Sequence, residues 1–292
     1  MIFPSTFSIV AHDPSEPAWG IAVASKFLAA GAVVPWARAG AGAVATQSHA
    51  NTSFGPLGLD LMENGLSAQE VLDILIQADS ERALRQVGLV DRQGRAATFT
   101  GQSCYHWAGG LTGEGFAVQG NILVGADVVH AMADTFTKSM AGLPRRLYQA
   151  LLAGDQAGGD RRGRQSAAIL VVKPAGGYGG LNDRWVDYRV DDHPDPVHRL
   201  GEILELHELY FDHSPESDQL QLEGDLLRKV QSLLSRLGYY QGQINGNYDA
   251  ATQSAFRSFI GNENFEERTD FENGRIDRPV LDYLFRHFGE TQ

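Results

Sequence analysis

The first twenty-five residues constrain the fold most, because they carry two β-strand patterns separated by one polar turn. Residues 6–11 alternate, with Phe7 and Ile9 on one face and Thr6 and Ser8 on the other. Residues 19–25 form a nearly continuous run of small apolar side chains, which is typical of a second strand. The two segments therefore predict neighbouring strands of one sheet.

The ends of these two strands carry groups that suit nucleophilic chemistry. The pleat places Thr6 and Ser8 on one face, and the second strand ends in Ser25 followed by Lys26. A hydroxyl beside an amine is a candidate nucleophile, and a lysine whose pKa is lowered by burial is a candidate base. The structural alternative is a buried Lys26 that pairs with an aspartate, either Asp13 or Asp160.

The length of 292 residues predicts one large and one small domain, and 43% hydrophobic residues allow a substantial core. The net charge of −12 argues against a sequence-independent grip on nucleic acid or on anionic lipid. No apolar run is long enough to span a membrane, and the sequence starts without a secretory signal pattern. We therefore expect a cytoplasmic protein without a nucleic-acid or membrane partner.

The order of predicted elements indicates the fold class. A capping box at 67–70 precedes a helix, a hairpin is predicted over 86–101 with a third strand at 104–108, and helices are predicted at 126–140 and 144–152. Strands near 169–172 and 185–190 and a helix at 197–210 follow. Such blocks of strands and helices predict an α+β fold, with a pair of antiparallel sheets covered by helices on both outer faces.

A Gly- and Arg-rich loop at 158–166 leads into a buried strand. Such a loop can present backbone N–H groups and guanidinium groups to a carboxylate or a phosphate. It can equally be a solvated loop whose arginines pair with nearby acids. The sequence leaves both interpretations open.

Two other groups of residues contain side chains of the types used in catalysis or in metal binding. Cys104 and His106 lie on one strand face by their spacing, which makes a thiol catalyst one alternative, but a single cysteine is most often a core residue. The acidic and histidine residues of the later segment match no zinc spacing, and they are Asp191, Asp192, His193, His198 and His207. The segment is more typical of a capped turn before a helix than of a divalent-metal site, so we expect no metal and no cofactor.

The segments before residue 213 resemble the DUF1028 family of bacteria and archaea, over about residues 5–212. The matching motifs are 6–11, 22–27, 34–37, 43–47, 85–88, 119–123, 158–160, 162–168 and 189–193. The family has no assigned reaction. The resemblance implies a four-layer αββα sandwich like that of the N-terminal-nucleophile (Ntn) hydrolases, in which a Thr, Ser or Cys at the mature N-terminus attacks an amide and its free α-amine serves as the base.

This resemblance makes Thr6 the candidate nucleophile. Catalysis of this type requires cleavage between Ser5 and Thr6, because five residues precede the threonine. We expect Ser25 and Lys26 to orient or activate the hydroxyl, with Asn121 or Gln47 as donors to an oxyanion. The substrate-binding residues that we expect are Gln47, Asp160, Arg162, Gln165 and Ser166.

A change of composition marks a linker at 213–221, and a compact helical module follows at 222–292. Residues 222–288 resemble the small three-helix peptidoglycan-binding domain, through a Leu-Gly-Tyr-Tyr helix stop, an Ile-Asn-Gly turn and a Thr-led second helix. The resemblance implies a shallow groove for a cell-wall peptide or glycan. We expect that groove near Tyr239, Tyr240, Asn245 and Tyr248.

Three functions are compatible with these patterns. The first is an amide hydrolase that acts on wall-derived peptides or other small amides. The second is a non-catalytic protein that binds a small molecule or a muropeptide on an Ntn-like scaffold. The third is a structural protein that assembles as a homo-oligomer through its C-terminal helices.

Overall fold

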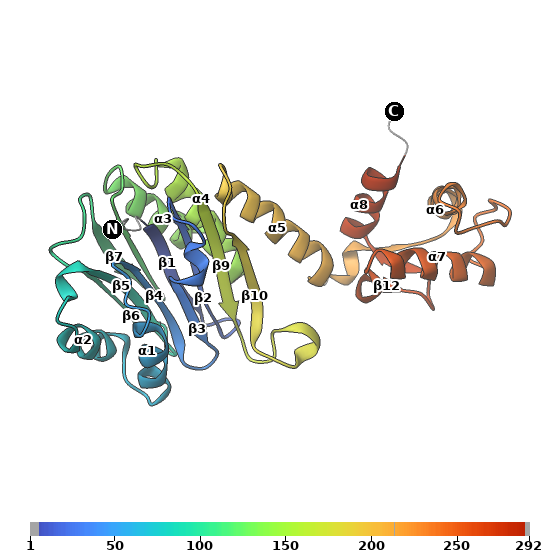
Figure 1. The fold of residues 1–292 in the computed structure, drawn as a ribbon. Coiled ribbons are helices and arrows are strands. Elements are labelled where there is room, and N and C mark those ends of the chain that lie inside the picture. Colours follow the sequence, from blue (N-terminus) through green and yellow to red (C-terminus); the bar gives the residue numbers. More distant parts are fainter. Residues whose placement is uncertain (1–5, 213, 290–292) are drawn as a thin grey trace. The chain divides into compact units, whose positions relative to one another are not determined.

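The computed structural model describes residues 6–212 and 214–289. By its internal contacts the chain divides into two units, Met1–Leu204 and Glu205–Gln292, and the division falls within helix α5 (Pro196–Phe211). Figure 1 shows the elements of both units. The linker expected at 213–221 stays a prediction.

The first unit contains two antiparallel sheets. The six-stranded sheet has the order β10 (Arg184–Val190), β9 (Ser166–Val172), β2 (Ala18–Ser25), β1 (Thr6–Asp13), β8 (Phe116–Asn121) and β7 (Gly109–Gly113). The four-stranded sheet has the order β3 (Pro35–Arg38), β4 (Gly42–Ser48), β5 (Arg85–Asp91) and β6 (Ala96–Thr100). The predicted neighbours at 6–11 and 19–25 are β1 and β2, paired in antiparallel register.

Helices cover the outer face of each sheet and give the predicted four-layer αββα sandwich (Figure 1). The helices are α1 (Phe54–Glu63), α2 (Ala68–Ala78), α3 (Asp127–Lys138) and α4 (Leu143–Gln156), besides α5. Phe7 and Ile9 of β1 pack with α3, α4 and the first half of α5, whereas Val10 packs between the sheets. Thr6 and Ser8 share the face of Val10, so the pleat directs them toward the second sheet.

Local sequence signals predicted several helices and strands correctly. Ser67 caps α2, because its hydroxyl accepts from the backbone N–H of Glu70 while the Glu70 carboxylate accepts from the N–H of Ser67. The predicted hairpin is β5 and β6. The third strand expected at 104–108 is wrong, and the strand is instead the glycine-rich β7.

The position of β7 follows from close packing. A Cβ at Gly110 would lie 2.8 Å from the carbonyl oxygen of Val118 and 2.9 Å from the hydroxyl of Thr98. The bulkier residues at 104–108 have higher strand propensity, but a side chain does not fit at Gly110. Tertiary packing therefore decided this strand against local propensity.

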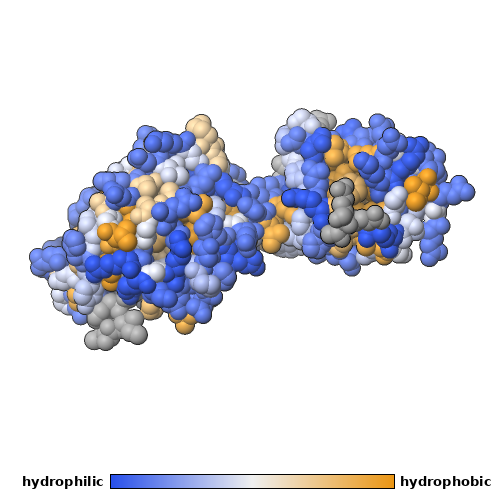
Figure 2. All heavy atoms as spheres, turned by 90° about the horizontal axis from the view of Figure 1, so that it is seen from above, coloured by the Kyte–Doolittle hydropathy of each residue, from blue (hydrophilic) through white to orange (hydrophobic). Residues whose placement is uncertain are grey.

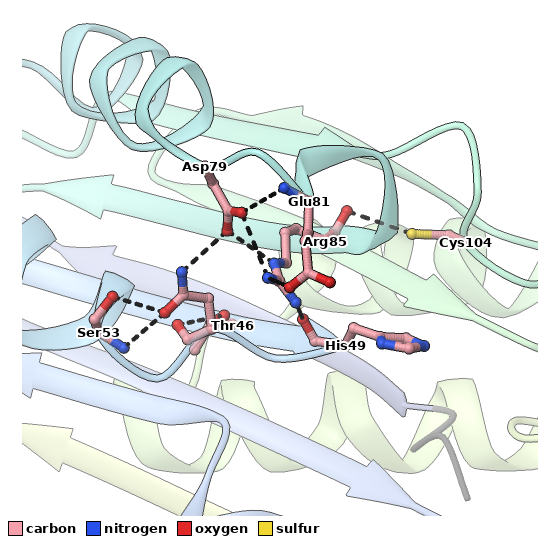
Figure 3. A network of polar contacts seen from close by, with 8 residues as sticks. Thr46, His49, Ser53, Asp79, Glu81, Arg85 and Cys104 are labelled. Carbon is pink, nitrogen blue, oxygen red and sulfur yellow. Dashed lines mark hydrogen bonds and ion pairs between the residues drawn. The ribbon is translucent and has the colours of Figure 1, made fainter. Parts of the chain in front are cut away.

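A buried ion pair joins α2 to the four-stranded sheet (Figure 3). Arg85 Nε, on the first residue of β5, lies 2.8 Å from Oδ2 of Asp79, and the two side chains are 10% and 8% exposed. Asp79 also accepts from Asn51 Nδ2 and from the N–H of Glu81. The hydrogen bond from Arg85 contributes most to lowering the pKa of Asp79 to about 2.

The single cysteine belongs to the same region (Figure 3). Cys104 is half-buried and its thiol donates to the carbonyl oxygen of Arg85, 3.3 Å away. Burial raises the pKa of this thiol. The alternative of a thiol catalyst has no support, because a nucleophilic cysteine needs a lowered pKa.

The second unit is built on three helices and one small sheet. The helices are α6 (Gly224–Arg236), α7 (Ala250–Asn262) and α8 (Arg278–Phe288), and the sheet has the order β11 (Gln219–Gln221), β13 (Arg275–Asp277) and β12 (Thr269–Asp270). The three helices were predicted. The strands were not, because two or three residues are too few to reveal an alternating pattern.

A buried arginine organises the small sheet. Arg268 is 4% exposed, and its Nε donates to Asp277 Oδ2 at 2.6 Å. Its Nη1 donates to the carbonyl oxygens of Glu208 and Leu209 near the end of α5. Arg268 therefore satisfies carbonyl groups that the end of a helix leaves without partners.

The surface of the first unit is mostly hydrophilic on the face seen in Figure 2, and its hydrophobic residues form separate spots. Large exposed apolar side chains include Leu28, Leu57 and Leu181. Among the described residues, no helix combines the length and the apolar character that crossing a membrane requires.

We expect Asp79 to make the stability of the first unit depend on acidic pH. Its folded pKa of about 2 lies below the ordinary aspartate value of 3.8, so the stabilisation is present above pH 4 and is lost as the pH falls toward 2. Asp79→Asn should lower the free energy of unfolding by about 2 kcal/mol at pH 7 and should flatten this part of the pH profile. Urea unfolding followed by tryptophan fluorescence measures both effects. The exposed Asp73→Asn is the control, and equal stability of the two variants at pH 7 would contradict the prediction.

Candidate functional site

Thr6 begins the central strand β1, between the end of β2 and the end of β8. The register pairs it with Ser25 on one side and with Asn121 on the other. Thr6 Oγ1 and Ser25 Oγ lie 3.3 Å apart, and the three residues are 0%, 2% and 1% exposed. The structure therefore brings together three of the four residues predicted to be catalytic.

A glutamine that we did not select from the sequence lies at the centre of the contacts around Thr6. Gln86 of β5 accepts at Oε1 from Gln47 Nε2 at 2.8 Å and from Asn121 Nδ2 at 2.9 Å. Its own Nε2 donates to the carbonyl oxygen of Gly120. The available signal was a glutamine next to the apolar middle of a predicted strand, since a buried amide needs several partners.

The polar contacts continue along the space between the sheets. Ser8 Oγ donates to Gln47 Oε1 at 2.6 Å and accepts from Gln119 Nε2 at 2.7 Å. Gly88 leaves the room for this glutamine, because a Cβ there would lie 2.1 Å from Gln119 Oε1. We call Ser8, Gln47, Gln86, Gln119 and Asn121 the inter-sheet polar network.

The prediction for Gln47 is corrected by this arrangement. Gln47 is fully buried, and its Nε2 also donates to the backbone carbonyl oxygen of Thr6 at 3.3 Å. Both ends of its amide therefore have protein partners. Gln47 positions Thr6 and does not face a binding surface.

Lys26 does not have the buried position that the sequence predicts. The side chain is exposed and its Nζ donates to the carbonyl oxygen of Arg164, 3.2 Å away. Its backbone N–H, and not its amine, donates to Asp160 Oδ2. The chain leaves the sheet after Ser25, so the next side chain points to solvent and neither the buried base nor the buried ion pair is formed.

The loop after α4 is held by its own ion pairs. Asp160 is 6% exposed and accepts from the backbone N–H and from the guanidinium of Arg162, which in turn donates to the carbonyl oxygen of Lys26. Arg164 Nε donates to Asp155 Oδ1 at 2.7 Å. These contacts support the interpretation that Arg162 and Arg164 pair with nearby acids.

The remaining predicted binding residues also fix the surrounding backbone. Ser166 Oγ donates to the carbonyl oxygen of Phe27 and accepts from the N–H of Ala30. Gln165 Nε2 donates to Asp192 Oδ1 at 3.1 Å. These bonds hold three segments together at the end of the sheet where Thr6 lies.

A cavity of about 370 Å³ opens at this end of the six-stranded sheet. Its lining includes Phe7, Ser25, Asp155, Asp160, Arg164 and Ser166. Ser25, which lines the cavity, also contacts the candidate nucleophile Thr6. Asp155 was missed from the sequence, where it is one acid near the end of an amphipathic helix.

The four residues expected to form a groove in the second unit have internal contacts. Tyr240 is 4% exposed and its hydroxyl donates to the carbonyl oxygen of Gln243, so the prediction that it contacts a ligand is wrong. Tyr239 packs on Phe259, and Tyr248 donates to the carbonyl oxygen of Phe271. These aromatic residues belong to a core that helices of this length need for stability.

A buried glutamine holds the turn that contains Asn245. Gln231 is fully buried, and its Oε1 accepts from the backbone N–H groups of Asn245 and Gly246 at 3.0 and 2.9 Å. Its Nε2 donates to Thr252 Oγ1 at 2.9 Å and to the carbonyl oxygen of Asn247. Asn245 Oδ1 accepts from the N–H of Asn247 and completes the turn.

The layers and the strand order define a four-layer αββα sandwich, followed by a small helical domain. Residues 6–200 match the model of the "Family of unknown function (DUF1028)", and residues 210–284 match the model "Putative peptidoglycan binding domain". The chain belongs to the DUF1028 family. The search of curated proteins found no match to this chain.

Two of the solved structures that are similar to this chain illustrate the range of similarity. One is the crystal structure of protein SPO2555 from Silicibacter pomeroyi, a DUF1028 protein, with 32% sequence identity and a TM-score of 0.64 over 70% of this chain and 89% of that chain. The other is Anbu (ancestral β-subunit) from Yersinia bercovieri, with 11% identity and a TM-score of 0.31 over 72% of this chain and 98% of that chain. The first similarity supports the fold, and the second is too low to carry an argument.

We expect Gln231→Ala to destabilise the second unit by about 3 kcal/mol, because it leaves backbone N–H groups of the turn without acceptors. Hydrogen exchange of the full chain, read by mass spectrometry, should show lost protection in α6 and α7 and no change in the first unit. Gln243→Ala, at an exposed glutamine nearby, is the control. Unchanged protection in α6 and α7 would contradict the role assigned to Gln231.

Proposed function

We propose that the protein is an amide hydrolase in which Thr6 is the nucleophile. The observation that carries this proposal is the position of Thr6 at the start of the central strand, between Ser25 and Asn121, of which Ser25 also lines the cavity. The αββα sandwich supports it, because this fold places the first residue of a central strand at the end of the sheet pair. The family itself has no assigned reaction.

In the proposed reaction, Thr6 Oγ1 attacks the carbonyl carbon of an amide and gives an ester with release of an amine. A base takes the hydroxyl proton and the leaving amine receives it, and water then hydrolyses the ester. The base is the α-amine of Thr6, which exists only after cleavage between Ser5 and Thr6. Ser5 lies outside the described residues.

The residues around Thr6 have supporting roles in this proposal. Ser25 contacts the hydroxyl at 3.3 Å and orients it. Asn121 Nδ2 is held by Gln86 and is the candidate donor to the oxyanion. Lys26 has no part in the proposed chemistry, since its amine is directed to Arg164.

The proposal for the substrate rests on the second domain. A domain that matches a peptidoglycan-binding model favours a ligand related to the cell wall. We therefore propose wall-derived peptides or other small amides as substrates. Assembly into a homo-oligomer stays a separate prediction, for which the measurement is the mass of the full chain in solution.

A non-catalytic binding function is the second candidate. It is favoured by the complete burial of Thr6 and by the peptide bond that joins Ser5 to it in the full sequence. In that state the nitrogen of Thr6 is an amide and is not a base. Equilibrium dialysis with muropeptides, showing binding without release of amine, would favour this candidate over the hydrolase.

We expect the active species to begin at Thr6. The intact mass of freshly purified protein and of protein after long incubation measures this directly. A mass that corresponds to a chain starting at Thr6 supports the hydrolase. A chain that retains Ser5 after incubation and still releases amine from its substrate would exclude the α-amine as the base.

We expect Thr6→Ala to abolish release of primary amine from muropeptides, with a loss of roughly 10³-fold or more, because no other group replaces the nucleophile. Thr6→Ser should retain part of the activity, since it keeps a hydroxyl. Thr137→Ala, on helix α3, is a control away from Thr6. Activity of Thr6→Ala equal to that of the unmodified protein would disprove the role of Thr6.

A further inference from the structure

We propose that Asp155, Asp195 and His198 form a binding site for a divalent transition-metal ion beside the cavity. The proposal does not depend on the chemistry of Thr6. Each of the three residues offers one ligand atom, and these atoms all lie within 4.8 Å of one another. A metal ion with ligand distances near 2 Å joins atoms at such separations after small side-chain movements.

The three residues come from two elements of the first unit. Asp155 is in the last turn of α4, Asp195 directly precedes α5, and His198 is in the first turn of α5. Asp155 is 40 residues away from Asp195 in the sequence. No spacing rule connects them, and only the packing of α4 and α5 places them together.

The second observation is the state of the Asp155 carboxylate. Its side chain is 4% exposed and Oδ1 accepts from Arg164 Nε at 2.7 Å. Its Oδ2 is buried and has no hydrogen-bond partner among the described residues. A buried carboxylate oxygen without a partner is unfavourable, and a cation bound at Oδ2 would remove that cost.

The charges around the site favour a cation. The two carboxylates of Asp155 and Asp195 face one guanidinium, that of Arg164. Arg164 occupies the other oxygen of Asp155, so it orients the carboxylate and leaves Oδ2 for the ion. The net charge of −12 of the whole chain adds a weak attraction.

Asp195 and His198 are ordered before any ion binds. His198 Nδ1 lies 2.9 Å from Asp195 Oδ1, and the N–H of Asp195 donates to His193 Nδ1. Their side chains are 47% and 52% exposed, so an ion reaches them from solvent. Asp155 forms the buried side of the proposed site, and Asp195 and His198 form its solvent-exposed side.

The donor atoms indicate the class of ion. Two carboxylate oxygens and one imidazole nitrogen suit Zn²⁺ or Mn²⁺, whereas Ca²⁺ and Mg²⁺ prefer oxygen ligands alone. Three protein ligands leave at least one coordination position for water or for a bound molecule. The cavity offers space for that molecule, because Asp155, Pro196 and Val197 belong to its lining.

The test uses the full chain without an affinity tag, first stripped of metal and then dialysed against Zn²⁺. Metal analysis should find one tightly bound Zn²⁺ per chain, and Ca²⁺ should bind at least tenfold more weakly. His198→Ala and Asp155→Asn should each weaken Zn²⁺ binding by tenfold or more. His130→Ala removes an exposed histidine of α3 and should leave the affinity unchanged.

A second measurement separates loss of the site from loss of the fold. Zn²⁺ should raise the melting temperature of the unmodified protein and of His130→Ala, and it should not raise that of His198→Ala. His198 is half exposed, so its replacement leaves the core intact. The proposal is overturned if the unmodified protein binds no Zn²⁺, or if His198→Ala and Asp155→Asn bind it as tightly as His130→Ala does.

Discussion

The burial of β1 on both faces is the constraint on which the rest of the first unit depends. Every residue of this strand is buried, so its two faces must meet different surroundings. Phe7 and Ile9 pack in the apolar layer under the helices, whereas Thr6 and Ser8 point between the sheets. Hydroxyl groups in that position need partners, and the inter-sheet polar network supplies those of Ser8.

The inter-sheet polar network connects the fold to the candidate site. Gln47 comes from the four-stranded sheet and donates to the backbone of Thr6, while Gln86 from the same sheet orients Asn121. Because the partners of Gln47, Gln86 and Gln119 lie on both sheets, the network resists sliding of one sheet over the other. Sheet packing and the geometry around Thr6 are thus set by the same hydrogen bonds.

The sequence predicted the site in part. Thr6, Ser25 and Asn121 were correct neighbours, because strand ends and family motifs both located them. Lys26 was misplaced, since a strand pattern does not tell where the chain turns away from the sheet. Gln86 and Asp155 were missed because a single polar residue at the end of a strand or helix reveals its role only through its partners in the folded chain.

The sequence by itself determined the α+β class and the three C-terminal helices, because periodic burial and capping signals are local and add up along each element. The family and its four-layer sandwich came from the resemblance of the sequence motifs to DUF1028. Only the tertiary structure decided that β7 is the glycine-rich segment, that Tyr240 is a core residue and that Asp155 meets Asp195 and His198. These outcomes depend on contacts between distant residues. Such contacts depend on shape complementarity and on hydrogen bonds to buried polar groups, and neither property follows a periodic pattern in the sequence.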